Sequence, residues 1–582
     1  MGGSVGQEGG ERTLYRELSG SHSVTSVPPS AYDVILHGGK VVTLDRASRI
    51  VEALGVRAGR IAAVGAAPEI LKGRSPGTRV IDISGRTVTP GFCDGHPHMD
   101  RSGLRSLGGI PLDGCDSVAQ IVEVVSEAAA RTPAGRWIVL MPMGTDPLGY
   151  VYRPDQLKEG WFPTRYDLDA VAPDHPVYIR APWAWWSHRP FPSVANTRAL
   201  ALAGVTRATE APYNVTIVKD VRGEPTGVFL DENRTPLLEY TLMACVPRVS
   251  YEDRVTSVRL ASAIYSAAGT TAGYEGHGLT PAILDAYRHV HAAGELTVRM
   301  QLALSLPTAA FDDGRTADLL YHWAPTLRGR GSGDDMLKFE GVAFDISDPR
   351  TAAILARSYP YEQWAGHFPQ ALSYERFVEL GVLAARLGLR VNCCVPYDFE
   401  RVLRAYEAID AEVPIRDRRW VVIHVTEASS EQIRRMKALG VVATVNPGFM
   451  YMASDRFGLA TLGERGTPIR QLLDAGIPVA LSTDNVPHSM LFAMQQALTR
   501  WDDDSHRRLG PSGLTREDAL RMATQARHVL TWEEDDRGTL EVGKVADFVV
   551  LGDDPLTCHE EAIARIPVEQ TWVSGRRVFP GA

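Results

Sequence analysis

Eight short runs of β-branched and apolar residues alternate with helical segments through the middle of the chain. The first run enters the segment 90–99, and the others cover residues 270–275, 298–304, 336–342, 390–395, 420–425, 441–446 and 478–483. Strands that alternate with helices pair in parallel, because the chain must cross over between them. Eight such units predict an α/β fold, a closed (β/α)8 barrel of the TIM type. A doubly wound open sheet is the alternative, but no G-x-G-x-x-G or phosphate-binding loop ends a strand.

The two ends of the chain have a different texture from its middle. Residues 31–88 and 538–582 consist of short β-branched runs broken by glycine. Neither end has enough strands to bury a core alone, so we expect one small β-sandwich domain built from both. Residues 89–537 would form the barrel, with a long insertion at about 100–250 after its first strand. Residues 1–30, rich in Gly and Ser, are expected to be a disordered tail.

Net charge and hydropathy argue against two classes of binding partner, nucleic acids and membranes. A net charge of −9 over 582 residues argues against nucleic acid as a partner. No apolar run approaches the roughly 18 residues that cross a bilayer, so no membrane partner is expected. The first thirty residues lack the apolar segment of a signal peptide, and the six cysteines form no C-x-x-C pair. We therefore expect a cytoplasmic enzyme that acts on a small molecule.

The segment Pro90-Gly-Phe-Cys-Asp-Gly-His-Pro-His-Met99 presents two histidines at the end of the first predicted strand. In a strand, residues i and i+2 point to the same side, so His96 and His98 can converge on one metal ion. His-x-His alone is a weak signal, because two histidines in a turn are often polar surface. Its weight comes from what the other strands carry.

Three further strands carry polar residues suited to the same site. Lys338 lies on the fourth strand, His424 ends the sixth, and Asp484 ends the eighth. Barrel enzymes keep their chemistry at the carboxyl ends of the strands, where these side chains would meet. Each has an ordinary structural explanation by itself, such as a helix cap or a core histidine. Their joint placement predicts a site for a divalent cation.

These motifs resemble the amidohydrolase superfamily, in particular the branch that includes N-substituted formamide deformylases. The resemblance runs from about Tyr32 to Phe579. It rests on Pro90-Gly-Phe-x-Asp-x-His-x-His98, Thr226-Gly-Val228, Leu462-Gly-Glu-Arg465, Asp474-Ala-Gly-Ile-Pro-Val-Ala-Leu-Ser-Thr-Asp484 and Gly538-Thr-Leu-Glu-Val-Gly-Lys-Val-Ala-Asp547. Related enzymes are often dimers, so the resemblance implies a homodimer.

The resemblance also implies two divalent ions, Zn²⁺ or Fe²⁺. His96 and His98 would hold one ion, and Lys338, carboxylated by CO₂, would bridge both. His424 would bind the second ion together with a histidine on the fifth strand. Asp484 would bind metal and act as the catalytic proton shuttle. Two cations acidify a bridging water and polarise the scissile carbonyl.

The chain departs from this pattern on the fifth strand. Asn392 occupies the expected histidine position, within Val391-Asn-Cys-Cys-Val-Pro396. Asparagine is a weak ligand, and Cys393 or Cys394 could substitute as a thiolate, although strand alternation turns only one of them inward. Three further candidate ligands stand near the predicted strand ends: Glu340, Glu275 and His277.

Aromatic residues suggest where a substrate would bind. The insertion contains Trp183-Ala-Trp-Trp-Ser-His-Arg-Pro-Phe191. Any one of these rings is expected to be core, but together they could form a lid or an apolar wall at the barrel mouth. The candidates for contact with the substrate are Trp183, Trp186, His188 and Phe449.

Three functions remain open at this point. The first is hydrolysis of an amide or another C–N bond in a bulky, largely apolar small molecule. The second is a non-heme diiron monooxygenase, since a diiron lineage that acts on diterpenoid natural products resembles this superfamily. O₂ would then be a partner, because histidine and carboxylate ligands suit Fe(II) when open positions remain. The third, a broken site, is hard to reconcile with five intact ligand positions.

Overall fold

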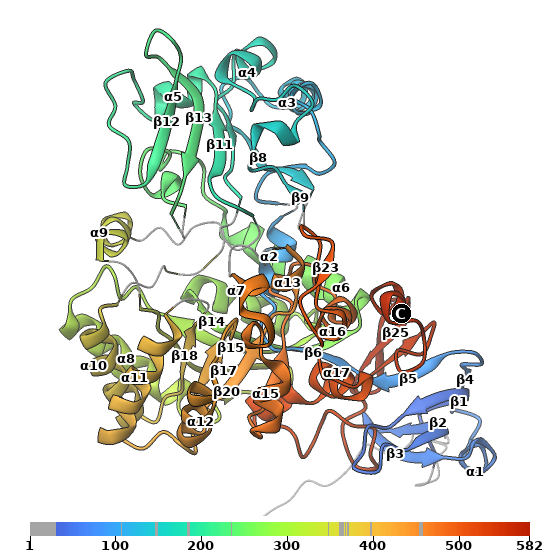
Figure 1. The fold of residues 1–582 in the computed structure, drawn as a ribbon. Coiled ribbons are helices and arrows are strands. Elements are labelled where there is room, and N and C mark those ends of the chain that lie inside the picture. Colours follow the sequence, from blue (N-terminus) through green and yellow to red (C-terminus); the bar gives the residue numbers. More distant parts are fainter. Residues whose placement is uncertain are drawn as a thin grey trace, which may run out of the picture.

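A barrel of parallel strands forms the centre of the molecule in the computed structural model (Figure 1). The structure describes residues 31–581 except 106, 146–148, 183–186, 234–235, 347–348, 360–365, 367, 369–371, 396–397 and 453–457. Its barrel strands pair in the order β6 (Phe92–Asp94), β14 (Thr270–Leu279), β15 (Arg299–Ser305), β17 (Leu337–Ala343), β18 (Val391–Cys394), β19 (Val421–Ile423), β20 (Val442–Val445) and β21 (Val479–Leu481). The predicted (β/α)8 barrel is thus confirmed.

Backbone hydrogen bonds bring the first and last strands of the barrel together. The Gly95 amide donates to the Leu481 carbonyl at 2.8 Å, and the Asp484 amide donates to the His96 carbonyl at 3.0 Å. The loops after β6 and β21 therefore lie side by side. This closure places the two motifs that carry His96 and Asp484 at one edge of the barrel.

Helices between the strands surround the barrel. They include α6 (Tyr251–Ala267), α7 (Pro281–Ala292), α8 (Asp313–Leu327), α10 (Tyr374–Arg386), α11 (Phe399–Glu412), α12 (Ser430–Leu439), α15 (Ile469–Asp474), α16 (Met490–Thr499) and α17 (Arg516–Thr524). Capping boxes begin α6, α12 and α17 at Ser250, Ser429 and Thr515. In each, the cap hydroxyl and an acidic or amide side chain three residues on satisfy amides that the helix leaves unpaired.

The two ends of the chain meet in one mixed sheet beside the barrel (Figure 1, blue and red). Its order is β26 (Arg576–Phe579), β25 (Val568–Val573), β24 (Phe548–Leu551), β5 (Thr87–Pro90), β1 (Val34–Val42), β2 (Ile50–Arg57) and β3 (Arg60–Gly65), with β4 (Arg79–Asp82) on β1. Asp547 anchors this sheet to the barrel, because its carboxylate accepts from the Arg299 guanidinium of β15 at 2.7 and 3.1 Å.

The segment between β6 and α6 folds into a separate α/β unit above the barrel (Figure 1, cyan to green). Its sheet runs β12 (Val215–Lys219), β13 (Pro225–Asp231), β11 (Phe191–Ala195), β10 (Val177–Ile179), β8 (Ile138–Thr145) and β7 (Ile110–Leu112). Val177 and Ile179 face α3 (Val118–Arg131) and α4 (Arg165–Val171), whereas Tyr178 faces α5 (Thr197–Leu202). Period-two alternation along β10 thus builds a core on each face of the sheet.

Across the parts of the chain that the structure describes, no helix combines the length and the apolar character that spanning a membrane requires.

Candidate metal centre

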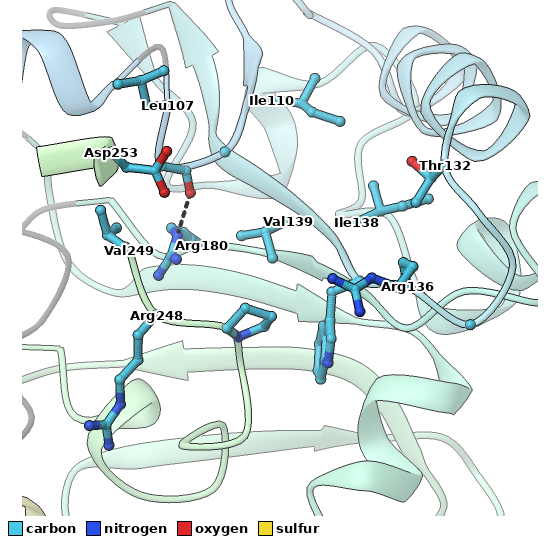
Figure 2. A pocket seen from close by; sticks show the side chains of 15 residues that line it. Leu107, Ile110, Thr132, Arg136, Ile138, Val139, Arg180, Arg248, Val249 and Asp253 are labelled. Atoms are coloured by element: carbon cyan, nitrogen blue, oxygen red, sulfur yellow. Dashed lines mark hydrogen bonds between the residues drawn. The ribbon is translucent and has the colours of Figure 1, made fainter. Parts of the chain in front are cut away.

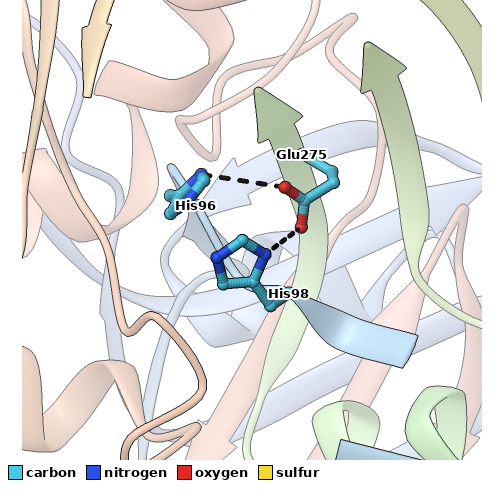
Figure 3. A group of neighbouring side chains, drawn as sticks. All are labelled: His96, His98 and Glu275. Carbon is cyan, nitrogen blue, oxygen red and sulfur yellow. Dashed lines mark ion pairs between the residues drawn. The ribbon is translucent and has the colours of Figure 1, made fainter. Parts of the chain in front are cut away.

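Four strands bring buried histidines and carboxylates to one point of the barrel mouth. His96 and His98 follow β6, Glu275 lies in β14, His424 follows β19 and Asp484 follows β21. Ligand atoms of His96, His98 and Glu275 lie within 4.8 Å of one another (Figure 3). The ligand atoms of His96, His424 and Asp484 also lie within 4.8 Å of one another. His96 belongs to both groups, so the two groups of potential ligands meet at its ring.

His98 stands between the two carboxylates of this cluster. Its Nδ1 lies 3.0 Å from Glu275 Oε2, and its Nε2 lies 3.0 Å from Asp484 Oδ1. The His96 ring stands edge-on to it, with 4.2 Å between the ring centroids. His424 Nε2 lies 3.8 Å from the same Asp484 oxygen, so Asp484 is shared by the histidines.

The donor set fits a divalent cation. His96 is fully buried, and neither of its ring nitrogens has a hydrogen-bond partner among the described residues. An unpaired buried polar atom costs about 1–3 kcal/mol, so two on one ring need a compensating ligand. Imidazole nitrogens with carboxylate oxygens suit zinc and iron. The cluster therefore combines three features of a metal centre: metal-binding side chains, burial, and ring nitrogens of His96 that have no hydrogen-bond partner among the described residues.

Burial and mutual contacts set the protonation of the cluster. Burial alone would raise the pKa of Asp484, but His424 and His98 lower it to about 2, so the group is a carboxylate at neutral pH. Burial holds the pKa of His96 well below its ordinary value, and the neighbouring His98 adds to the shift. His96 is thus in the neutral form in which imidazole binds metal, whereas at His98 the effect of burial is outweighed by Glu275 and Asp484, which raise its pKa.

The backbone around the centre is held in conformations that most residues avoid. His98, His424 and Asp484 have φ values of 44°, 60° and 53°, in the left-handed region. Such residues cost free energy and persist where the surrounding structure fixes them. Asp94 supplies part of this restraint, since its carboxylate accepts from the amides of His96 at 3.0 Å and Thr483 at 3.1 Å.

A second group of potential ligands lies beside the first. His277 of β14, Asp345 after β17 and Cys394 at the end of β18 have ligand atoms within 4.8 Å of one another. His277 Nε2 lies 3.6 Å from Asp345 Oδ2, and the His277 ring centroid lies 5.4 Å from that of His98. Sequence reasoning missed Asp345, although its place just beyond the carboxyl end of the fourth strand was a usable signal.

Lys338 lies toward the opposite mouth of the barrel. It is near the amino end of β17, and its Nζ donates to Glu533 Oε1 at 2.9 Å. A strand rises about 3.3 Å per residue, so Lys338 and Asp345 stand roughly 20 Å apart. The expectation that a carboxylated Lys338 bridges two ions is therefore wrong. The carboxyl end of β17 lies at the centre, whereas Lys338 lies near the amino end of this strand.

Glu340 is also kept from the centre. Its side chain is fully buried inside the barrel, with Oε1 3.2 Å from an Arg390 guanidinium nitrogen. Glu340 precedes Asp345 by roughly 16 Å of strand. The structure thus places it as the partner of a buried arginine, and it corrects the expectation of an added oxygen ligand.

The side-chain amide of Asn392 is hydrogen-bonded to other residues of the protein. Its Oδ1 accepts from the Tyr274 hydroxyl at 2.6 Å, and its Nδ2 donates to the Val342 carbonyl at 3.2 Å. Cys394, two residues on, is the side chain of β18 that joins the candidate ligands. Of the two thiols left open by the sequence, Cys393 is buried in the core around the barrel.

The candidate substrate contacts are only partly described. Trp183 and Trp186 lie outside the described residues. His188 packs on Tyr152, with 4.6 Å between ring centroids, and its Nε2 lies 3.5 Å from an Asp504 oxygen. The buried ring of Phe449 lies 5.0 Å from that of His424, so it forms an apolar wall of the centre.

Comparison with known proteins places this architecture in context. Residues 79–579 match the model of the amidohydrolase family. The chain is 26% identical to an N-substituted formamide deformylase of Arthrobacter pascens, over 93% of this chain and 97% of that protein. It is 24% identical to Protein LONG AFTER FAR-RED 3 of Arabidopsis thaliana, over 97% of this chain and 95% of that protein.

Solved structures share the fold. An uncharacterised metal-dependent hydrolase of Pyrococcus horikoshii superposes with a TM-score of 0.65 at 21% sequence identity, over 91% of this chain and 99% of that one. A second such hydrolase, from Pyrococcus furiosus, gives a TM-score of 0.63 at the same identity, over 90% of this chain and all of that one. At this identity the likeness concerns the fold, and the site must be argued from its own residues.

Proposed function

The chain belongs to the amidohydrolase family, and from this premise we propose that it cleaves an amide or another C–N bond in a bulky, largely apolar small molecule. The observation that carries the proposal is the convergence of three histidines and two carboxylates from four strand ends. Fold alone does not choose a substrate. The choice of a C–N bond follows the similarity to the formamide deformylase, and that of an apolar substrate follows the aromatic residues of the insertion and the Phe449 wall.

The arrangement offers two neighbouring positions for divalent ions. His96, His98, Glu275, His424 and Asp484 would hold the first. The separate group of His277, Asp345 and Cys394 would hold the second. Divalent cations supply Lewis-acid polarisation of a carbonyl and a water of lowered pKa.

The chain's own residues supply orientation and proton transfer. Asp484 is a carboxylate at the centre, so it is the group available to accept a proton from water and return it to the leaving nitrogen. Asp94 fixes the loops that carry His96 and Asp484 relative to each other, through its bonds to the His96 and Thr483 amides. Phe449 shields the His424 side of the centre from water.

The test is metal content beside turnover. Protein purified without added metal should contain zinc or another divalent ion and should hydrolyse members of a panel of N-formyl and N-acyl amines. His96→Ala should lose both the ion and the activity, because it removes the ligand common to both parts of the first group. His291→Ala, which alters a histidine paired with Asp334, is the matched control and should keep both. Full turnover by metal-free His96→Ala protein would refute the proposal.

A non-heme diiron monooxygenase is the second candidate. It is favoured by the three carboxylates Glu275, Asp345 and Asp484 that stand among the histidines, a ligand set that suits Fe(II). Such an enzyme would contain iron as purified and consume O₂ in the presence of a reductant and its substrate. Hydrolysis that proceeds equally fast without oxygen would exclude this candidate.

A further inference from the structure

The insertion contains a cavity of about 580 Å³ that none of the candidate metal ligands lines (Figure 2). Its walls come from the segment 107–110, from the segment 132–139 that enters β8, from Arg180 after β10 and from the segment 247–253 that enters α6. Its volume is that of a typical small-molecule site. The catalytic proposal above leaves this cavity unused.

Positive charge dominates the polar part of the cavity. Arg136, Arg180 and Arg248 line it against a single aspartate, Asp253. Arg136 is exposed, and its guanidinium has no partner among the described residues. The whole chain carries a net charge of −9, so this positive patch is local and does not reflect overall composition.

The cavity's one aspartate is engaged elsewhere. Asp253 is the third residue of α6, and its carboxylate accepts from the Ser250 hydroxyl at 2.8 Å and the Ser250 amide at 3.2 Å. In this capping box the Asp253 carboxylate lies at the N-terminal end of α6. Asp253 is thus engaged at the end of α6, and the carboxylate that pairs with Arg180 is that of Glu239.

Arg180 gives the cavity a fixed donor. It is 3% exposed, and its guanidinium pairs with Glu239 and donates to the Gly108 carbonyl at 3.4 Å (Figure 2). Glu239 offsets the charge of Arg180, so this guanidinium serves the cavity as a fixed hydrogen-bond donor, which loses little conformational entropy when it binds a carboxylate or a phosphate. The more exposed Arg136 and Arg248 supply charge around it.

The remaining wall is apolar. Ile110, Ile138, Val139 and Val249 line the cavity beside the arginines. We propose that the cavity binds a small organic anion, with its carboxylate or phosphate group among the arginines and its apolar body against these side chains. The site is separate from the metal centre, and the proposal does not depend on the reaction catalysed there.

The test is calorimetric titration of the full chain with hexanoate and with hexyl phosphate, and hexanamide serves as the uncharged comparison. We expect saturable binding of at least one anion, and binding of hexanamide weaker by about tenfold or more. The anion that binds more tightly identifies the head group. Saturable binding of neither anion at millimolar concentration, or equal binding of hexanamide, would overturn the proposal.

Variants then locate the binding site. The double variant Arg136→Gln, Arg248→Gln changes two exposed side chains of the cavity and should weaken anion binding by at least about tenfold. Arg222→Gln, at an exposed arginine outside the cavity, should leave it within about twofold. His96→Ala should also bind normally. Unchanged binding by the double variant, or loss of binding in His96→Ala, would place the anion elsewhere and overturn the assignment.

Discussion

The hydroxyl of Tyr274 donates to Asn392 Oδ1 at 2.6 Å, and this bond engages the oxygen with which Asn392 on the fifth strand could bind a metal ion. The second hydrogen bond of Asn392, from Nδ2 to the Val342 carbonyl, leaves its amide fully engaged with the protein. A family position where a histidine was expected has thus become part of the barrel's internal hydrogen bonding. Cys394 takes the place beside the other ligands.

Asn392→His should therefore destabilise the protein without adding a metal ligand. The larger ring would break both hydrogen bonds at a buried position, which costs about 1–3 kcal/mol of unfolding free energy. Metal content should stay at the wild-type value. Tyr274→Phe is the matched variant, since it removes the same bond and adds no ligand, and it should cost a similar amount. An increase in bound metal in Asn392→His alone would contradict this assignment.

Lys338→Met tests the placement of Lys338 far from the centre. The variant should retain its metal and its turnover, because the amine pairs with Glu533 near the other mouth. Its unfolding free energy should fall by about 1 kcal/mol or less, since the pair is partly exposed. Short-chain carboxylic acids added to the variant should change nothing. Loss of metal with recovery on addition of such acids would restore the bridging role.

The barrel could be predicted from sequence because its signals are local and repeated. Each predicted strand appears in the structure with its ends shifted by a few residues, for example 441–446 against Val442–Val445. Alternation with helices dictates parallel pairing whatever the details of each loop. His96, His98, His424 and Asp484 were found by the same logic, since each ends a strand.

Which of the other candidate residues reach the centre could not be predicted, because the sequence does not show how far each residue lies from the carboxyl end of its strand. Lys338 lies near the amino end of β17 and Asp345 lies two residues beyond its carboxyl end, and only the position of that end tells which one reaches the centre. In the same way, Asn392 and Cys394 differ by two residues and share a face, so alternation could not separate them. The left-handed backbone at His98, with a φ of 44°, also leaves no local signature in the sequence.

Glu340 should make stability depend on pH. Burial raises the pKa of Glu340 to about 7, even though Arg390 opposes the shift. In the unfolded chain the carboxyl group ionises near 4.5, so between these values the folded protein keeps a proton that the unfolded chain has lost. The unfolding free energy contributed by this group is therefore full below pH 4.5 and falls as pH rises to 7.

Glu340→Gln removes this dependence, because the amide never ionises. It should be about as stable as the wild type near pH 4.5 and more stable by roughly 3 kcal/mol above pH 7. Denaturant unfolding of both proteins at pH 5 and pH 8 measures the difference. Glu412→Gln, at an exposed carboxylate paired with Arg386, is the control and should show little change. A pH-independent effect of Glu340→Gln would argue against a buried titrating carboxyl group.

The neighbouring thiols Cys393 and Cys394 give the sharpest test of the second metal position. Cys394 stands with His277 and Asp345, whereas Cys393 is 1% exposed and packs in the core, with its Sγ 3.8 Å from Asp345 Oδ1. With cobalt(II) as the probe ion, thiolate ligation produces a near-ultraviolet charge-transfer band. We expect that band in the wild type and in Cys393→Ser, and we expect its loss in Cys394→Ser. Cys394→Ser should also bind one ion fewer, because serine is a much poorer ligand than thiolate for these metals. A band that survives in Cys394→Ser but disappears in Cys393→Ser would show that β18 turns the other thiol toward the ions, and the second position would have to be rebuilt around it.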